Sequence, residues 1–150
     1  MDIITFVCYG NICRSPMAEF VFNDLIAKQN LSDKFVANSR ATSREEEGSG
    51  VYMPTIMELV RRGVPYSDRC STVFTLDDYN KAKYIVCMDR RNYNTLMKMT
   101  DNDSDKKIRM LLSFDGDDSD VADPWYTRDF ARSYDDILRG CKALIGFLTK

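Results

Sequence analysis

Apolar residues along this chain form short runs that alternate with segments of helical spacing. The run from Ile3 to Val7 is mostly apolar and β-branched, which is typical of a buried strand. Three further stretches, 34–39, 83–88 and 108–112, are strand candidates. Because strands that alternate with helices build a parallel sheet covered on both faces, the pattern predicts an α/β fold.

Four segments carry apolar residues at helical spacing. The first is expected to begin at Ser15-Pro16, with serine as N-cap and proline at the first helical position. The second starts at Pro54 and is expected to stop at Gly63. A third lies around 92–99, and the last runs from Ser133 to the C-terminus with one apolar face. Residues 113–126 are expected to form a long acidic loop.

Length and composition are those of one globular unit. The chain has 150 residues, of which 44% are hydrophobic and 29% charged, and neither a linker nor an internal repeat divides it. We therefore expect a single domain over residues 1–150. A formal net charge of −2 gives no sign of a nucleic-acid partner.

Targeting signals and cysteine usage indicate the compartment. The N-terminus lacks a signal-peptide pattern, and no apolar run approaches the roughly 18 residues that span a bilayer, so no membrane insertion is expected. Five cysteines, an odd number, fit reduced thiols better than a disulfide framework. A cytoplasmic location is therefore expected.

The absence of histidine narrows the possible chemistry. There is no Ser-His-Asp triad, no Cys-His pair and no histidine metal ligand. The cysteine spacings contain no Cys-x-x-Cys, which argues against a structural zinc site. No metal and no cofactor are expected, and catalysis must depend on thiol, carboxyl, hydroxyl or cationic side chains.

The segment after the first predicted strand combines a thiol with an anion-binding pattern. Cys8 follows a strand end, where open parallel sheets bind ligands. The predicted helix N-terminus and the cation of Arg14 favour the thiolate form, which is the nucleophile. Ser15 is expected to donate a hydrogen bond to the sulfur. A buried cysteine beside a glycine turn is the bland alternative, and a Walker-type loop is excluded by the missing Gly-Lys-Ser/Thr ending.

The same loop suits a phosphate dianion. Its backbone N–H groups are expected to curl around the phosphate oxygens, and Gly10 and Asn11 tolerate the positive φ angles that such a curl needs. Arg14 offers a planar fork to two oxygens. The predicted phosphate-binding loop consists of Tyr9, Gly10, Asn11, Ile12, Cys13, Arg14 and Ser15.

A proton donor for the leaving group is expected in the acidic loop. Asp123 differs from the other aspartates there because Pro124 restricts the backbone of the residue before it. Trp125 and Tyr126 follow and are suited to stack on an aromatic leaving group. Asp123 is therefore the candidate general acid, and an aspartate that only opens an aromatic-packed turn is the alternative.

These motifs resemble a known family. The stretch from Val7 to Glu19 (VCYGNICRSPMAE) closely resembles the signature of the low-molecular-weight protein tyrosine phosphatases, and residues 123–126 (DPWY) match their acid motif. Residues 38–43 and 87–89 are also similar to the family pattern. The resemblance implies a four-stranded parallel sheet and metal-independent hydrolysis of phosphotyrosine through a cysteinyl-phosphate intermediate. Cys8 would be the nucleophile, Arg14 the phosphate clamp, and Asp123 first the acid and then the base.

The resemblance also assigns supporting roles. Asn11, Ser15 and Ser39 would hold the loop in shape. Cys13 would form a protective disulfide with Cys8 under oxidation, unless it is only a small apolar filler. The expected partners are phosphotyrosine-containing proteins, with inorganic phosphate and similar oxyanions as competitive ligands, and the protein is expected to be a monomer.

One segment departs from the family pattern. After Thr42-Ser43 the family usually has an aromatic or bulky apolar residue that walls the cleft, whereas this chain has acids at 45–47. An acidic rim would favour basic phosphopeptides; the alternative is a solvated surface loop. The residues expected to border the substrate cleft are Tyr9, Glu46, Glu47, Trp125 and Tyr126.

Three other functions compete with this interpretation. Arsenate reductases of related fold need two further cysteines in a disulfide relay, but Cys70 and Cys87 are far apart in sequence, and Cys87 lies in an apolar run. Protein arginine phosphatases tend to carry a small threonine where this chain has Ile12. A redox-sensing or phosphotyrosine-binding module without turnover would lack a catalytic group, and none is missing.

Overall fold

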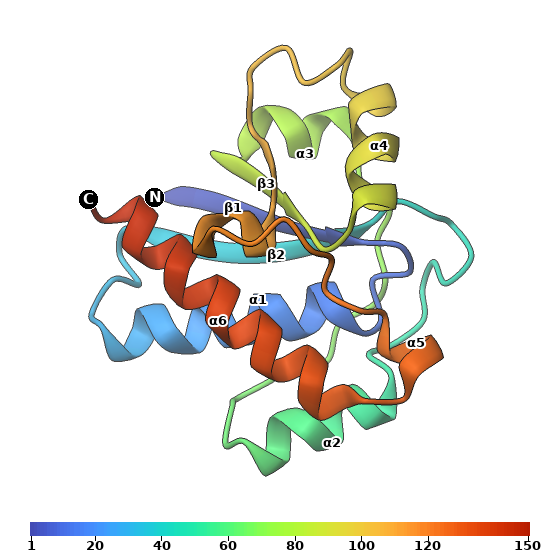
Figure 1. Cartoon of the computed structure of the whole chain (residues 1–150), viewed down its shortest axis with the longest axis vertical. Helices are drawn as coiled ribbons and strands as arrows, with labels where there is room; N and C mark the ends of the chain where they lie inside the picture. The colour runs from blue at the N-terminus through green and yellow to red at the C-terminus, as the bar shows by residue number, and fades with distance from the viewer.

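The computed structural model describes residues 1–150, and its strands form one parallel sheet (Figure 1). The strands are β1 (Asp2–Cys8), β2 (Phe35–Ala41), β3 (Tyr84–Cys87) and β4 (Ile108–Met110). They lie in the order β2-β1-β3-β4, and every neighbouring pair is parallel. The predicted α/β fold with a four-stranded parallel sheet is confirmed.

Helices cover both faces of the sheet. Figure 1 shows α1 (Arg14–Lys28), α2 (Met53–Arg61) and α6 (Phe130–Leu148) on one side, and α3 (Leu76–Lys81) and α4 (Arg90–Met99) on the other. Alternate residues of β1 serve the two faces, as the period of a strand requires. Ile4 and Phe6 pack into the larger core with α1 and α6, whereas Val7 packs into the smaller core with Tyr79 of α3 and Leu96 of α4.

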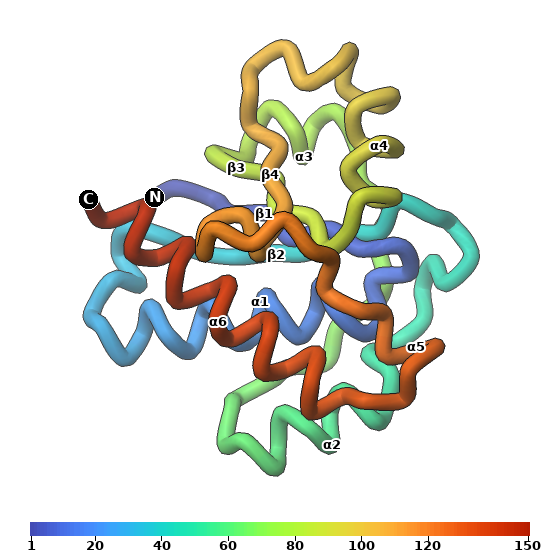
Figure 2. The backbone as a smooth tube through the Cα atoms, in the orientation of Figure 1, coloured from blue at the N-terminus to red at the C-terminus, as the bar shows by residue number.

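The strand order places the functional loop. β1 is central, and its two neighbours are reached by connections that leave on opposite faces, so the carboxyl ends of β1 and β3 form a topological switch point. Cys8 ends β1 and Cys87 ends β3. Figure 2 shows that both termini lie at the end of the molecule opposite the loop after β1.

The start of α1 differs from the predicted one. The N-cap position is Cys13, without a side-chain cap, so the prediction of Ser15 as N-cap is wrong. Ser15 lies inside the first turn, where its hydroxyl contacts Cys8 and Asn11 instead of capping the helix. Pro16 is tolerated there because first-turn N–H groups have no intrahelical partner.

Other helix boundaries differ from the predicted ones because side-chain caps determine where the helices start. α4 starts at Arg90, two residues before the predicted start, because Asp89 accepts from the Asn92 N–H and caps it. α3, which was not predicted, is opened by a Thr75–Asp78 capping box. Gly63 has φ +73°, as a glycine stop for α2 requires.

The second half of the chain has more regular structure than predicted. β4 ends at Met110, and the next residues form the 3₁₀ helix η1 (Leu111–Asp115). The predicted acidic loop contains the short helix α5 (Pro124–Thr127). α6 begins at Phe130, capped by Asp129, and packs against η1 so closely that a Cβ at Gly140 would lie 2.5 Å from Leu111 Cγ. None of the helices combines the length and apolarity needed to cross a membrane.

Candidate active site

Cys8 lies at the base of a cavity of about 290 Å³. Its sulfur accepts the backbone N–H groups of Asn11 at 3.3 Å and Ser15 at 3.4 Å, and lies 3.0 Å from Ser15 Oγ. Donors directed at one sulfur from several sides stabilise its anionic form. This geometry suits the predicted role of Cys8 as nucleophile.

The loop after Cys8 turns its carbonyl groups away from the cavity. The carbonyl oxygens of Cys8, Tyr9, Gly10, Ile12 and Cys13 all accept hydrogen bonds from surrounding segments, at 2.8 to 3.2 Å. No acceptor within the protein pairs with the backbone N–H groups of Tyr9, Gly10, Ile12, Cys13 or Arg14. Such a row of free donors in a curled loop is what an oxyanion requires.

One of the two residues that tolerate a positive φ adopts it. Asn11 has φ +58°, and this allows the loop to turn around the sulfur. Gly10 does not have a positive φ. A Cβ at Gly10 would meet Glu46 Cγ at 3.5 Å, an ordinary contact distance.

Arg14 is a fixed cation beside Cys8. Its side chain is 3% exposed, and Nη1 donates to Asp89 Oδ2 and to the Val121 carbonyl oxygen, each at 2.8 Å. Nη2 lies 3.4 Å from Asp123 Oδ2. Burial alone lowers the pKa of Arg14, but the surrounding anionic groups outweigh it and raise that pKa above its ordinary value. The guanidinium therefore stays charged and is aimed by its partners.

Asp123 faces the same cavity from the start of α5. Its backbone is extended (φ −78°, ψ 113°), as expected for a residue before proline. Oδ1 accepts the Trp125 N–H at 3.0 Å, whereas Oδ2 is the oxygen near Arg14. One carboxylate oxygen is thus held by its own turn, and the other is presented to the site.

The cavity is lined by aromatic and by acidic side chains. Tyr9, Trp125 and Tyr126 line it as expected, and Trp125 packs against Tyr52 at 5.0 Å between ring centroids. The acidic residues that line it are Glu45 and Glu46. Glu47 does not line the cavity and pairs with Arg44 at 3.3 Å, so of the two expected glutamates only Glu46 is found there and Glu45 takes the place of Glu47.

The three predicted loop-support residues come together. Asn11 Nδ2 donates to Ser15 Oγ at 2.7 Å and to Ser39 Oγ at 3.0 Å. All three side chains are buried. They connect the loop to β2.

The remaining cysteines differ from Cys8. Cys13 lines the cavity as a free thiol, and burial raises its pKa to about 12. Burial also raises the pKa of Cys87 and of Cys141. Cys70 is exposed and does not line the cavity. Cys8 is therefore the one cysteine here that combines cavity access with donors on its sulfur.

Two contacts of the site went unrecognised in the sequence. Asp89 belongs to the stretch 87–89 that is similar to the family pattern, but nothing in the sequence indicates that it pairs with Arg14, 75 positions away. Arg69 carries no motif at all, yet its Nη1 donates to Asn11 Oδ1 at 3.0 Å. A free cysteine, an anion-binding loop, a buried arginine and a carboxylate in one cavity define a cysteine-dependent phosphate-handling site.

Comparison with known proteins agrees with this class. The family model of the low molecular weight phosphotyrosine protein phosphatases matches residues 3–150. The low molecular weight protein-tyrosine-phosphatase YfkJ of Bacillus subtilis is 35% identical, covering 100% of this chain and 97% of its own. Its crystal structure superposes with a TM-score of 0.95 at 34% identity, covering 99% and 95%.

Two other proteins extend the comparison. PtpA of Staphylococcus aureus, a protein of the same description, is 34% identical over 98% of this chain and 94% of its own. The structure of a Drosophila arginine phosphatase superposes with a TM-score of 0.90 at 25% identity, covering 100% and 99%. This chain belongs to the low molecular weight phosphotyrosine protein phosphatase family, which confirms the resemblance drawn from its motifs.

Proposed function

We propose that this enzyme hydrolyses phosphotyrosine in proteins, and small aryl phosphates, with Cys8 as nucleophile. The observation that carries the proposal is the convergence of hydrogen-bond donors on the Cys8 sulfur beneath a ring of free backbone N–H groups. That arrangement suits a thiolate and a phosphate in contact.

In the first step, the Cys8 thiolate attacks phosphorus while the bond from phosphorus to the phenolic oxygen breaks. Asp123 gives its proton to that oxygen, so the leaving group departs as a neutral phenol. The loop N–H groups and Arg14 bind the phosphoryl oxygens before and during the transfer. Arg14 supports this role because its contacts to Asp89 and Val121 already aim its fork.

In the second step, water attacks the phosphorus of the cysteinyl-phosphate. The Asp123 carboxylate accepts a proton from that water, the phosphorus–sulfur bond breaks, and Cys8 returns as a thiolate beside inorganic phosphate. Ser15 Oγ, at 3.0 Å, stabilises the departing sulfur. No step uses a metal or a cofactor, and we propose that inorganic phosphate and similar oxyanions compete with substrate.

The walls of the cavity favour an aryl leaving group. Tyr9, Trp125 and Tyr126 provide aromatic surface to the cavity. Ile12 also lines the cavity, at a position where arginine phosphatases, the main alternative, tend to have the smaller threonine. An arsenate reductase would need a cysteine relay, whereas Cys87 is buried and Cys70 lies outside the cavity. A module without turnover would lack the nucleophile, the phosphate clamp or the acid, whereas Cys8, Arg14 and Asp123 all line the cavity.

Charge at the mouth suggests a substrate preference. Glu45 and Glu46 have no cationic partner, whereas Glu47 pairs with Arg44. We propose that basic phosphopeptides are preferred over acidic ones. Each exposed charge contributes roughly 0.2–1 kcal/mol, so Glu46→Gln is expected to reduce the basic-to-acidic ratio of kcat/KM by roughly twofold to fivefold at low salt. Glu47→Gln is the matched control, and equal kcat/KM for both peptides in the wild type would remove the idea.

The cysteines suggest where the enzyme works. All five are free thiols, which supports a reducing, cytoplasmic location. Cys8 and Cys13 line the same cavity, which supports a reversible disulfide between them under oxidation. The activity as proposed uses residues of one chain only and needs no second subunit.

One assay tests the reaction itself. Hydrolysis of an aryl phosphate is followed in the presence of a chelator for the wild type, Cys8→Ser and Asp123→Ala, with Cys70→Ser and Asp118→Ala as matched controls outside the cavity. Cys8→Ser should abolish activity, and Asp123→Ala should lower kcat by roughly 10²- to 10⁴-fold. Full activity of Cys8→Ser would remove the mechanism, and full activity of Asp123→Ala would remove only the proposed acid.

A further inference from the structure

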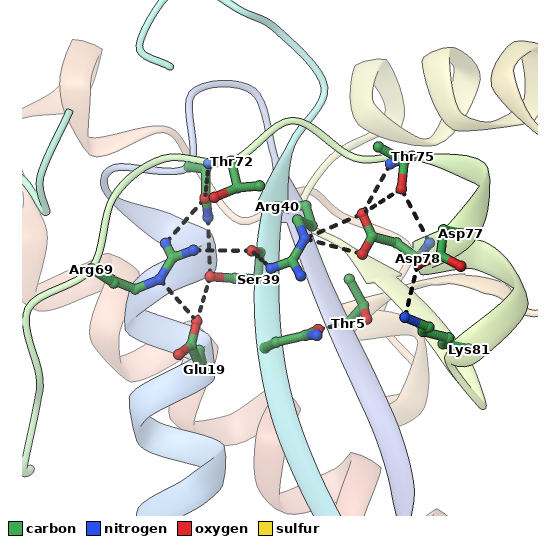
Figure 3. Close-up of polar contacts among 12 residues, drawn as sticks. Thr5, Glu19, Ser39, Arg40, Arg69, Thr72, Thr75, Asp77, Asp78 and Lys81 are labelled. Carbon is green, nitrogen blue, oxygen red and sulfur yellow. Dashed lines mark hydrogen bonds and ion pairs between the residues drawn. The ribbon is translucent and has the colours of Figure 1, made fainter. Parts of the chain in front are cut away.

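A second guanidinium, that of the half-buried Arg69, contacts the phosphate-binding loop through Asn11 and does not line the cavity. Arg69 belongs to the segment between α2 and α3, and Figure 3 shows its guanidinium joined by dashed lines to Ser39 of β2 and Glu19 of α1. Its side chain is 14% exposed. Nη2 donates to the Ser39 carbonyl oxygen at 3.1 Å, and Nε lies 3.4 Å from Glu19 Oε1. Nη1 donates to Asn11 Oδ1 at 3.0 Å.

The contacts of Asn11 determine which way its amide points. Its Oδ1 accepts from Arg69 and also from the Thr72 N–H at 3.1 Å. Because both neighbours are donors, the oxygen must be on that side. The Nδ2 group therefore faces the other way and donates to Ser15 Oγ at 2.7 Å and to Ser39 Oγ at 3.0 Å.

The direction of the Asn11 amide in turn determines the direction of the Ser15 hydroxyl. Ser15 Oγ accepts from Asn11, so its own hydrogen remains free to donate. The Cys8 sulfur at 3.0 Å is the nearer acceptor, since the Arg40 carbonyl oxygen is 3.4 Å away. The hydrogen bonds thus run in one direction, from Arg69 through Asn11 and Ser15 to the sulfur.

Glu19 holds the other end of the arrangement. Burial raises the pKa of Glu19, while the Ser39 hydroxyl, which donates to Oε1 at 2.5 Å, and the cation of Arg69 oppose that rise. Burial lowers the pKa of Arg69, and Glu19 opposes that change. The opposite charges of Glu19 and Arg69 therefore offset part of the cost of burying each, and the pairing holds the guanidinium beside the loop.

We propose that Arg69 is a positioning residue for the nucleophile: Nη1 fixes the amide of Asn11 while Nη2 and Nε hold the guanidinium in place, so that Ser15 donates its hydrogen to Cys8. The inference rests on the proposed role of Cys8. A lysine at this position would keep the charge, but a single ammonium does not reproduce the planar fork that reaches Asn11, Ser39 and Glu19 together. Shape as well as charge is therefore required.

The test follows the reactivity of Cys8 in the full-length protein as a function of pH. Iodoacetamide alkylates the thiolate, and mass spectrometry of the peptide that contains Cys8 reports the rate at that residue alone. In Arg69→Met and Arg69→Lys we expect the pH of half-maximal alkylation to rise by roughly one unit, the size of one lost charge-assisted hydrogen bond. In mildly acidic buffer kcat/KM should fall roughly tenfold, and it should recover as the pH rises.

Arg40 provides the matched control. Figure 3 shows this second arginine on the other side of Ser39, where it donates to the same carbonyl oxygen at 2.8 Å and pairs with Asp78. It makes no contact with Asn11. Arg40→Met should therefore leave the alkylation curve at its wild-type position.

A double-mutant cycle separates positioning from general loosening of the loop. If Arg69 acts through Ser15, Arg69→Met should cause no further shift in a Ser15→Ala background. The proposal is overturned if Arg69→Met has the wild-type curve, if Arg69→Lys restores it, if Arg40→Met shifts it equally, or if the shift persists without Ser15. Circular dichroism verifies folding at each pH; should Arg69→Met not fold, Arg69→Lys, which keeps a cation beside Glu19, decides alone. Alkylation does not depend on turnover, so this result is independent of whether Cys8 proves essential for hydrolysis.

Discussion

Replacing Asp89 with serine should reduce activity by removing a partner of Arg14 while keeping the cap of α4. The two carboxylate oxygens of Asp89 have separate functions: Oδ1 accepts the Asn92 N–H at 2.8 Å and caps α4, while Oδ2 accepts from Arg14 Nη1 at 2.8 Å. Serine is as good an N-cap as aspartate, so the cap survives. Its short, neutral side chain does not reach Arg14, so the contact that aims the guanidinium is lost.

The size of the effect follows from the burial of this pair. The Arg14 side chain is 3% exposed and that of Asp89 is 15% exposed, so solvent screens their contact little. A hydrogen bond between charged groups contributes ~1.5–3 kcal/mol, which corresponds to a loss of roughly 10- to 100-fold in kcat/KM if it is needed in the transition state. Arg14 keeps the Val121 carbonyl and Asp123 as partners, so the protein should remain folded.

The assay pairs steady-state hydrolysis of an aryl phosphate with urea denaturation. Asp129→Ser is the matched control, because Asp129 caps α6 in the same way, accepting the Arg132 N–H at 3.0 Å, and does not contact Arg14. The control should retain wild-type kcat/KM. Unchanged kcat/KM in Asp89→Ser, or an equal loss in the control, would refute the reasoning that Asp89 acts by aiming Arg14.

Three further predictions concern the core, the thiols and the cavity wall. Gly140→Ala would place a Cβ 2.5 Å from Leu111 Cγ, so the free energy of unfolding should fall by about 1–3 kcal/mol with KM unchanged; an unchanged urea midpoint would contradict this packing. Because the pKa of Cys13 is raised to about 12, iodoacetamide near neutral pH should modify Cys8 and leave Cys13 as a thiol, and peptide mapping that finds equal labelling would be inconsistent with this site. Trp125→Ala should raise KM for aryl phosphates severalfold without a comparable change for alkyl phosphates; parallel changes would mean that the ring does not contact the leaving group.

The sequence was most informative where neighbours in the chain are also neighbours in space. Cys8, Asn11, Arg14 and Ser15 fall within one loop, so their joint chemistry could be predicted from spacing alone. The alternating pattern was enough to predict the parallel sheet, because buried strands are apolar on both faces. Asp123 could be singled out because proline restricts it locally.

The sequence was least informative where distant residues meet through side chains. Nothing near Arg69 indicates that it contacts Asn11, 58 positions earlier, because that contact depends on how the segment between α2 and α3 crosses the sheet edge. The choice between Glu45 and Glu47 depends on a turn in which Glu47 reaches back to Arg44. Ser15 is not the N-cap because the helix already starts at Arg14, and its hydroxyl oxygen accepts from Asn11 Nδ2 instead.

Direct trapping of the intermediate tests the central claim. Asp123→Ala, which lacks the proposed base for the second step, is mixed with an aryl phosphate, quenched in acid within the first turnover and digested for mass spectrometry. One phosphoryl group is expected on the peptide that contains Cys8, and none on that peptide in a Cys8→Ser, Asp123→Ala double variant. Turnover by the wild type without phosphate on Cys8, or phosphate bound stably to another residue, would contradict it.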